Sequence, residues 1–87
     1  MKKSDWQIFN GIKKGNLVTF ENLFRKYYQA LCNYANKYVK DLDKAEEVVQ
    51  ELFYKLWEKR DKLDINISLK SYLYRSVYNG CLQYLNH

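Results

Sequence analysis

Residues 45–57 read AEEVVQELFYKLW, and the positions of their apolar side chains decide the fold. Apolar residues recur every three or four positions, which places them on one side of an α-helix. Asp43, with Glu46 three residues later, is a capping-box start, so we predict a helix over residues 43–61. Its buried stripe comprises Ala45, Val48, Val49, Leu52, Phe53, Leu56 and Trp57. Its polar face comprises Glu47, Gln50, Glu51, Tyr54 and Glu58.

Two helices are expected before this stretch. The first covers residues 5–14, where Ser4 and Gln7 form a capping pair. The second covers residues 20–40 and follows Thr19, a favourable N-cap. Its apolar stripe is long enough for the central helix of a core and consists of Phe20, Leu23, Phe24, Tyr27, Leu31, Tyr34, Ala35 and Tyr38.

A polar connection and a fourth helix follow. The segment KRDKLDINIS, residues 59–68, is long for a loop between packed helices, and loops of this length tend to carry function. Ser68 can cap a helix over residues 68–86. The inward side of that helix is expected to hold Leu69, Leu73, Ser76, Val77, Cys81 and Leu85.

Length and composition fit one small helical domain. The chain has 87 residues, contains no Pro, and is 47% hydrophobic or aromatic. Dividing it would leave two pieces too small to bury a useful core. We therefore predict an all-α fold, a compact bundle of about four helices, with residues 1–87 forming a single domain.

Charge is distributed unevenly along the chain, whose formal net charge is +5. Of its ten acidic residues, eight fall in the middle of the chain: Asp41, Asp43, Glu46, Glu47, Glu51, Glu58, Asp61 and Asp64. The end of the chain combines cations with tyrosines. Such a surface suits unpaired bases and phosphates, but tyrosines with wet hydroxyl groups can also simply rim a small core.

Several function classes are disfavoured by the sequence. Cys32 and Cys81 have no neighbouring ligand and are expected to be small buried residues in a reduced protein, so we predict neither a metal site nor a cofactor. His87 stands alone and no glycine-rich phosphate loop is present, so no catalytic residue and no enzyme activity are expected. No segment reads as a signal peptide or a membrane span, which predicts a cytoplasmic protein without membrane insertion.

Three stretches together carry a resemblance to a known family. They are FxxLFRxYY at 20–28, AEEVVQELFYKLW at 45–57, and SYLYR with Asn79 at 71–79. In order and spacing they resemble region 2 of the extracytoplasmic-function (ECF) group of bacterial RNA polymerase sigma factors, over residues 19–86. The resemblance implies a domain that docks on RNA polymerase core and that recognises and melts the promoter −10 element.

The resemblance assigns the docking role to the polar face of the third predicted helix. In the family, an acidic residue followed by Gln-Glu faces the clamp helices of the largest polymerase subunit. The matching residues are Glu47, Gln50 and Glu51. Their spacing places all three on one exposed face. Without the resemblance, such a face is more often simply a solvated acidic surface.

The resemblance assigns DNA contact to the loop and the fourth helix. The loop over residues 62–67 would receive a base flipped from the −10 non-template strand, and its polar groups would read that base. The expected DNA-binding residues of the loop are Lys62, Asp64 and Asn66.

On the fourth helix, Lys70 and Arg75 are candidate phosphate contacts and Asn79 is a candidate polar contact upstream. Tyr72 and Tyr74 are candidate stacking or wedge residues at the edge of the duplex. Two alternatives stay open: Tyr74 could be a residue of the core boundary, and Arg75 could pair with an acid on the third helix.

The sequence also departs from the family pattern. Primary sigma factors carry a tryptophan pair where Tyr72 and Leu73 stand. The absence of that pair is expected of the ECF group, which melts DNA less strongly. Family members normally continue into a helix-turn-helix domain that reads the −35 element, so we expect an excised domain or a truncated product. The alternative function is a helical protein-interaction domain that binds a partner such as an anti-sigma factor and no DNA.

Overall fold

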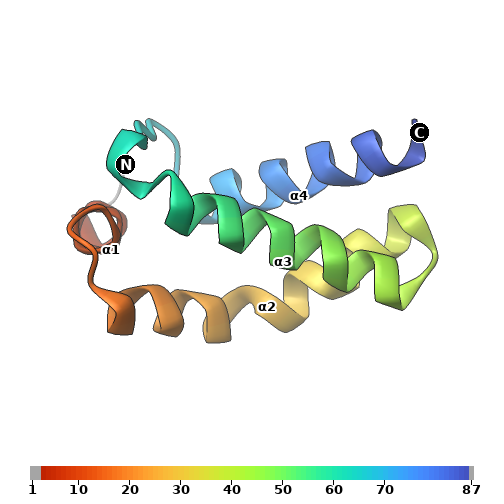
Figure 1. Cartoon of the computed structure of the whole chain (residues 1–87), viewed down its shortest axis with the longest axis horizontal. Coiled ribbons are helices and arrows are strands. Elements are labelled where there is room, and N and C mark those ends of the chain that lie inside the picture. The colour runs from red at the N-terminus through yellow and green to blue at the C-terminus, as the bar shows by residue number, and fades with distance from the viewer. Residues whose placement is uncertain (1–2, 87) are drawn as a thin grey trace.

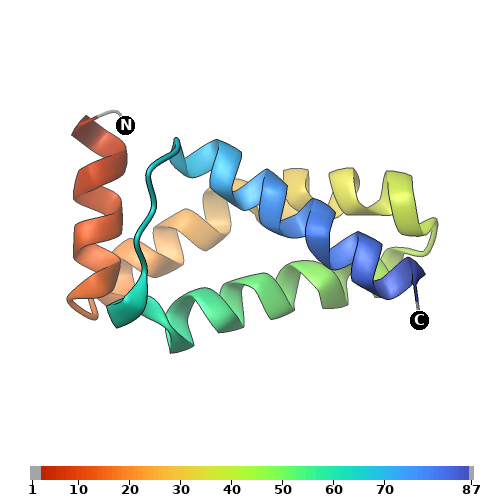
Figure 2. The same cartoon turned by 90° about the horizontal axis from the view of Figure 1, so that it is seen from above.

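Three long helices run along the molecule and a shorter one crosses one end of them (Figures 1 and 2). The computed structural model describes residues 3–86. Its elements are α1 (Lys3–Lys13), α2 (Leu17–Val39), α3 (Leu42–Glu58), the short 3-10 helix η1 (Arg60–Lys62) and α4 (Leu69–Leu85). The predicted all-α fold with four helices is confirmed, and residues 3–86 contain no strand.

The starts of α2 and α3 differ from the predicted starts because other residues cap these helices. The Asn16 side chain accepts a hydrogen bond from the Thr19 backbone N–H at 3.1 Å, so Thr19 lies inside the first turn of α2. The Asp41 side chain accepts from the Lys44 N–H at 3.2 Å, so Asp41 rather than Asp43 caps α3. Both capping residues have an extended backbone conformation, which lets a short acceptor side chain reach the free N–H groups of the first turn.

The other boundaries agree better with the predictions. Ser68 caps α4 as predicted, and its hydroxyl oxygen accepts from the Ser71 N–H at 3.1 Å. Gly15 follows α1 with a φ of 84°, a conformation that glycine adopts without strain. Ser4 is different, because α1 already includes Lys3 and Ser4 therefore lies within the helix.

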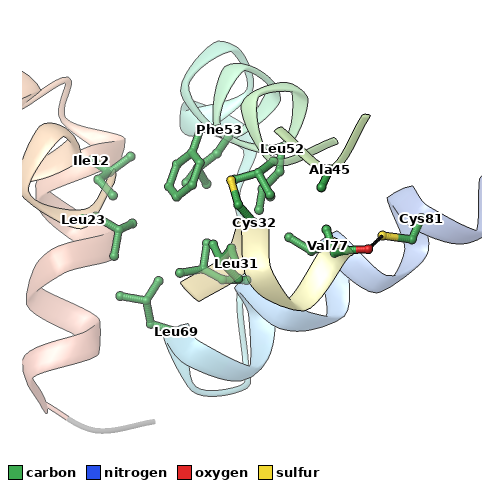
Figure 3. Close-up of a cluster of buried hydrophobic side chains, with 14 of the residues drawn as sticks. Ile12, Leu23, Leu31, Cys32, Ala45, Leu52, Phe53, Leu69, Val77 and Cys81 are labelled. Carbon is green, nitrogen blue, oxygen red and sulfur yellow. Dashed lines mark hydrogen bonds between the residues drawn. The ribbon is translucent and has the colours of Figure 1, made fainter. Parts of the chain in front are cut away.

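A single cluster of apolar side chains from all four helices fills the interior (Figure 3). Of the stripe predicted for α3, Val48 and Trp57 are only half-buried, and the fully buried members are Ala45, Val49, Leu52, Phe53 and Leu56. The Trp57 ring packs 4.9 Å from the ring of Phe20. The Arg60 guanidinium lies 4.3 Å from the centre of the Trp57 ring.

The buried line of α4 stops before the end of the helix. Leu69, Leu73, Val77 and Cys81 are buried, whereas Leu85 is 51% exposed, so the prediction for Leu85 is wrong. Residues four apart rotate by about 40° around a helix with 3.6 residues per turn. After four such steps from Leu69, position 85 has turned away from the core.

The two cysteines are buried and free, as predicted. The Cys81 thiol points at the Ala35 carbonyl oxygen of α2, with the sulfur 3.8 Å from that oxygen (Figure 3). Across residues 3–86, no group of side chains is arranged to hold a metal ion. None of the helices in this range is both long and apolar enough to cross a membrane.

Candidate functional site

The outer face of α3 is exposed where the sequence predicts a docking surface. Glu47, Gln50 and Glu51 all lie in the solvent. Each acid is close to a lysine of its own helix: Glu47 lies 3.5 Å from Lys44, and Glu51 lies 3.5 Å from Lys55. Exposed pairs of this kind contribute little to stability, so these carboxylates remain available to a partner.

Gln50 is held from the neighbouring helix by Tyr28 of α2. The Gln50 side-chain amide donates to the Tyr28 hydroxyl oxygen at 3.1 Å, and that hydroxyl donates to Glu46 at 3.4 Å. Burial raises the pKa of Tyr28, and its ring stacks 4.7 Å from that of Phe24. Tyr28 was not predicted from the sequence, because the predicted stripe of α2 passes through Tyr27.

An open groove of about 540 Å³ separates the solvent sides of α3 and α4. Its polar lining comes from Glu47, Glu51 and Lys55 on α3, from Lys59 directly after α3, and from Tyr72, Ser76, Asn79 and Gln83 on α4. The two helices approach closely where Gly80 faces Val48. A Cβ atom at Gly80 would lie only 2.9 Å from the Val48 Cγ1 atom, so the glycine permits this approach.

Tyr72 faces this groove and is half-buried. Its ring meets the ring of Phe9 edge-on at 6.0 Å, which joins α4 to α1. Burial raises the pKa of the Tyr72 hydroxyl, and a hydrogen bond with Ser76 acts in the opposite direction. Tyr72 is therefore fixed by packing rather than freely presented to solvent.

Tyr74 lies on the opposite flank of α4, against α2. Its ring packs 4.9 Å from Tyr34, which packs 5.3 Å from Tyr38, which in turn packs 5.3 Å from Tyr78. Hydrogen bonding with Tyr38 and burial raise the pKa of Tyr34 to about 12. The structure thus does not bring Tyr72 and Tyr74 together, and Tyr74 is a residue of the core boundary.

The two predicted phosphate-binding cations are exposed. Lys70 stands in the first turn of α4 and Arg75 lies further along the same helix. Within residues 3–86, the ion pairs shorter than 4 Å are those of Lys44 with Glu47 and of Lys55 with Glu51. The alternative in which Arg75 pairs with an acid of α3 is therefore wrong, and both charges are free for another partner.

The loop between η1 and α4 alternates between inward and outward side chains. Leu63 and Ile65 are half-buried and pack against the core, whereas Asp64 and Asn66 are exposed, as is Lys62 at the end of η1. The loop runs alongside α1 (Figure 2).

A long-range hydrogen bond fixes the end of this loop. The backbone N–H of Leu69 donates to the Asp5 carboxylate at 3.0 Å, so α1 satisfies a free N–H at the start of α4. The two residues are 64 positions apart, and no local pattern in the sequence predicts this contact.

Comparison with known proteins establishes the family. The model for sigma-70 region 2 matches residues 23–87, and the chain belongs to this family. The chain is also similar to an NMR structure of an engineered region 2 of sigmaE in complex with GTAAAA. The two are 29% identical, with a TM-score of 0.78, over 98% of this chain and 90% of that one. No curated protein matches the sequence significantly.

The expected resemblance to region 2 of an ECF sigma factor is confirmed by these two matches, since sigmaE is such a factor. A domain of this family acts in transcription and is not an enzyme, as predicted. The family match starts at Leu23, so α1 lies outside it.

Proposed function

We propose that this domain docks on the clamp helices of RNA polymerase core in the cytoplasm and recognises and melts the promoter −10 element. The observation that carries this proposal is the similarity, over 98% of the chain, to a region 2 structure in complex with GTAAAA. The exposed acidic face of α3 and the exposed cations of α4 support it, because they offer separate surfaces for the two partners.

The docking surface consists of Glu47, Gln50 and Glu51. All three are exposed, and the hydrogen bond from Gln50 to Tyr28 fixes the middle of the surface in place. An amide with a fixed position loses less rotamer freedom when it meets a partner.

A double charge reversal tests the docking surface. The Glu47→Lys/Glu51→Lys variant should keep its helicity and its unfolding midpoint, while capture of core polymerase falls to background, because charge complementarity is reversed. Glu21→Lys/Asp61→Lys is the matched control, since it changes the net charge equally at exposed residues outside α3. Equal capture by the folded test variant and this control would remove the docking role.

The DNA-binding surface has two parts with different tasks. The exposed loop side chains Lys62, Asp64 and Asn66 read a flipped base, whereas Lys70 and Arg75 attract the strand through its phosphates. Opening DNA costs a few kcal/mol per unstacked base, and binding of the exposed bases and backbone offsets this cost.

The other candidate DNA-binding residues of α4 do not form a freely accessible stacking surface. Tyr72 and Tyr74 support the DNA-binding surface from opposite flanks, because packing holds both rings. Asn79 contacts the strand from the side of α3, where it lines the groove beside the acidic residues.

Titration with single-stranded −10 oligonucleotides, varied one base at a time at several salt concentrations, separates the two tasks. Lys70→Ala or Arg75→Ala should weaken all oligonucleotides alike and lower the salt slope by about 0.7 log units each. Lys37→Ala is the control, since Lys37 is exposed on α2. A graft of another loop at residues 62–67 should change the preferred base and leave the slope nearly intact.

If the cation variants alter the preferred base and the loop grafts do not, then α4 itself reads the bases. Binding without any sequence preference would instead favour a protein-interaction domain, for which an anti-sigma factor is the expected partner.

A further inference from the structure

A pocket of about 320 Å³ lies between α1 and the loop that follows η1. Buried Phe9 and half-buried Leu63 and Ile65 give it an apolar floor. Its remaining lining residues are polar or carry an exposed ring: Trp6, Asn10, Lys13, Asp64 and Asn66. Half of the pocket therefore belongs to α1, which neither the motifs nor the family match involve.

Trp6 is the unusual member of this lining. Its side chain is 59% exposed, whereas Phe9 and Ile12 of the same helix are buried and anchor α1 to the core. A tryptophan with most of its surface in water contributes little to folding. Trp6 nevertheless lines a concave site next to the loop that would read a base.

We propose that Trp6 and Lys13 complete the pocket that holds the unpaired base, with the Trp6 ring stacked on the base and Lys13 at an adjacent phosphate. This inference rests on the proposed function and extends it to α1. The pocket has what an extruded base needs: an aromatic face, an apolar floor, and the amides of Asn10 and Asn66, each able to donate and accept hydrogen bonds at the base edge.

The two walls of this pocket are tied together before any strand binds. The hydrogen bond from the Leu69 N–H to the Asp5 carboxylate joins α1 to the end of the loop. Asp5 directly precedes Trp6 in α1. The edge-on contact of Phe9 with Tyr72 joins the next turn of α1 to α4. A pocket with fixed walls avoids the entropic cost of ordering them on binding.

Tryptophan fluorescence tests the stacking directly. In a Trp57→Phe background, Trp6 is the remaining tryptophan, and the preferred single-stranded −10 oligonucleotide should quench it. An oligonucleotide with an abasic site at the position whose base the loop reads should still bind through its phosphates but leave the fluorescence nearly unchanged.

Affinity provides the second measurement, on the otherwise unchanged protein. Trp6→Ala should weaken the preferred oligonucleotide about 5- to 150-fold, and Trp6→Phe should recover most of the loss. Tyr54→Ala is the matched control, because Tyr54 is 61% exposed on α3 and outside the pocket. The unfolding midpoint of each variant verifies that the fold is intact.

The outcomes distinguish this inference from the proposed function. If base preference and salt dependence persist while Trp6→Ala binds like the unchanged protein and Trp6 is not quenched, α1 has no part in the pocket and the inference is wrong. If the unchanged protein shows no base preference at all, the proposed function itself fails.

Discussion

The helices α3 and α4 have the same length, 17 residues, but use their surfaces in different ways. Around α3 the buried apolar side and the exposed polar side lie opposite each other, with half-buried side chains such as Val48 and Trp57 at the border between them. Around α4 a core line is flanked by tyrosines on two sides, each packed against a different helix. The exposed face of α3 can therefore be assigned from the sequence. On α4, packing against the neighbouring helices decides which tyrosines are exposed to a ligand.

Adjacent residues of α3 provide the largest expected contrast. Phe53→Ala should lower the free energy of unfolding by about 3–5 kcal/mol, because Phe53 is 2% exposed and packs against Phe20 and Phe24. Tyr54→Ala should change it by less than about 0.5 kcal/mol, since that ring is in solvent. Urea unfolding measures both. Similar losses in the two variants would mean that the faces of α3 are not separated as described.

The contact between the two helices gives an intermediate effect. Gly80→Ala should cost about 1 kcal/mol net, because crowding against Val48 costs about 1–3 kcal/mol and the higher helix propensity of alanine returns up to about 1. In a Val48→Ala background, the same change should be neutral or stabilising. A double-mutant cycle from urea unfolding measures this coupling, and additive effects would contradict a close approach at Gly80.

The start of α4 should respond to a change on α1. Asp5→Ala should lower the free energy of unfolding by about 1 kcal/mol, because the Leu69 N–H loses its acceptor. Asp5→Asn keeps an acceptor oxygen and should cost less. Amide hydrogen exchange at Leu69 provides a local measurement: it should speed up in Asp5→Ala well beyond the global loss of stability. Unchanged exchange would show that this contact does not hold the loop.

The faces of α3 can be predicted from the sequence because its apolar period and its polar face agree with each other. The exposed positions of Glu47, Gln50 and Glu51 follow from helical spacing alone. Cap positions were less secure, since Asp41 and Asp43 both have suitable side chains and only the backbone geometry selects Asp41.

The parts that could not be predicted depend on contacts between distant residues. The hydrogen bond from Gln50 to Tyr28 and the one from Leu69 to Asp5 join helices whose relative placement no local period specifies. The same holds for the packing partners of Tyr72 and Tyr74. Two residues apart on a helix, they face directions about 200° apart, and only the surrounding helices give each ring its partner.

The two buried thiols can be used to measure how often the domain opens. Burial raises the pKa of both Cys32 and Cys81, which disfavours the reactive thiolate. While the helices stay packed, a reagent also cannot reach either buried sulfur. An alkylating reagent can modify these residues only during an opening, and the modification rate therefore counts openings in the absence of denaturant. Because the Cys81 thiol is directed at the Ala35 carbonyl, its labelling follows the separation of α4 from α2.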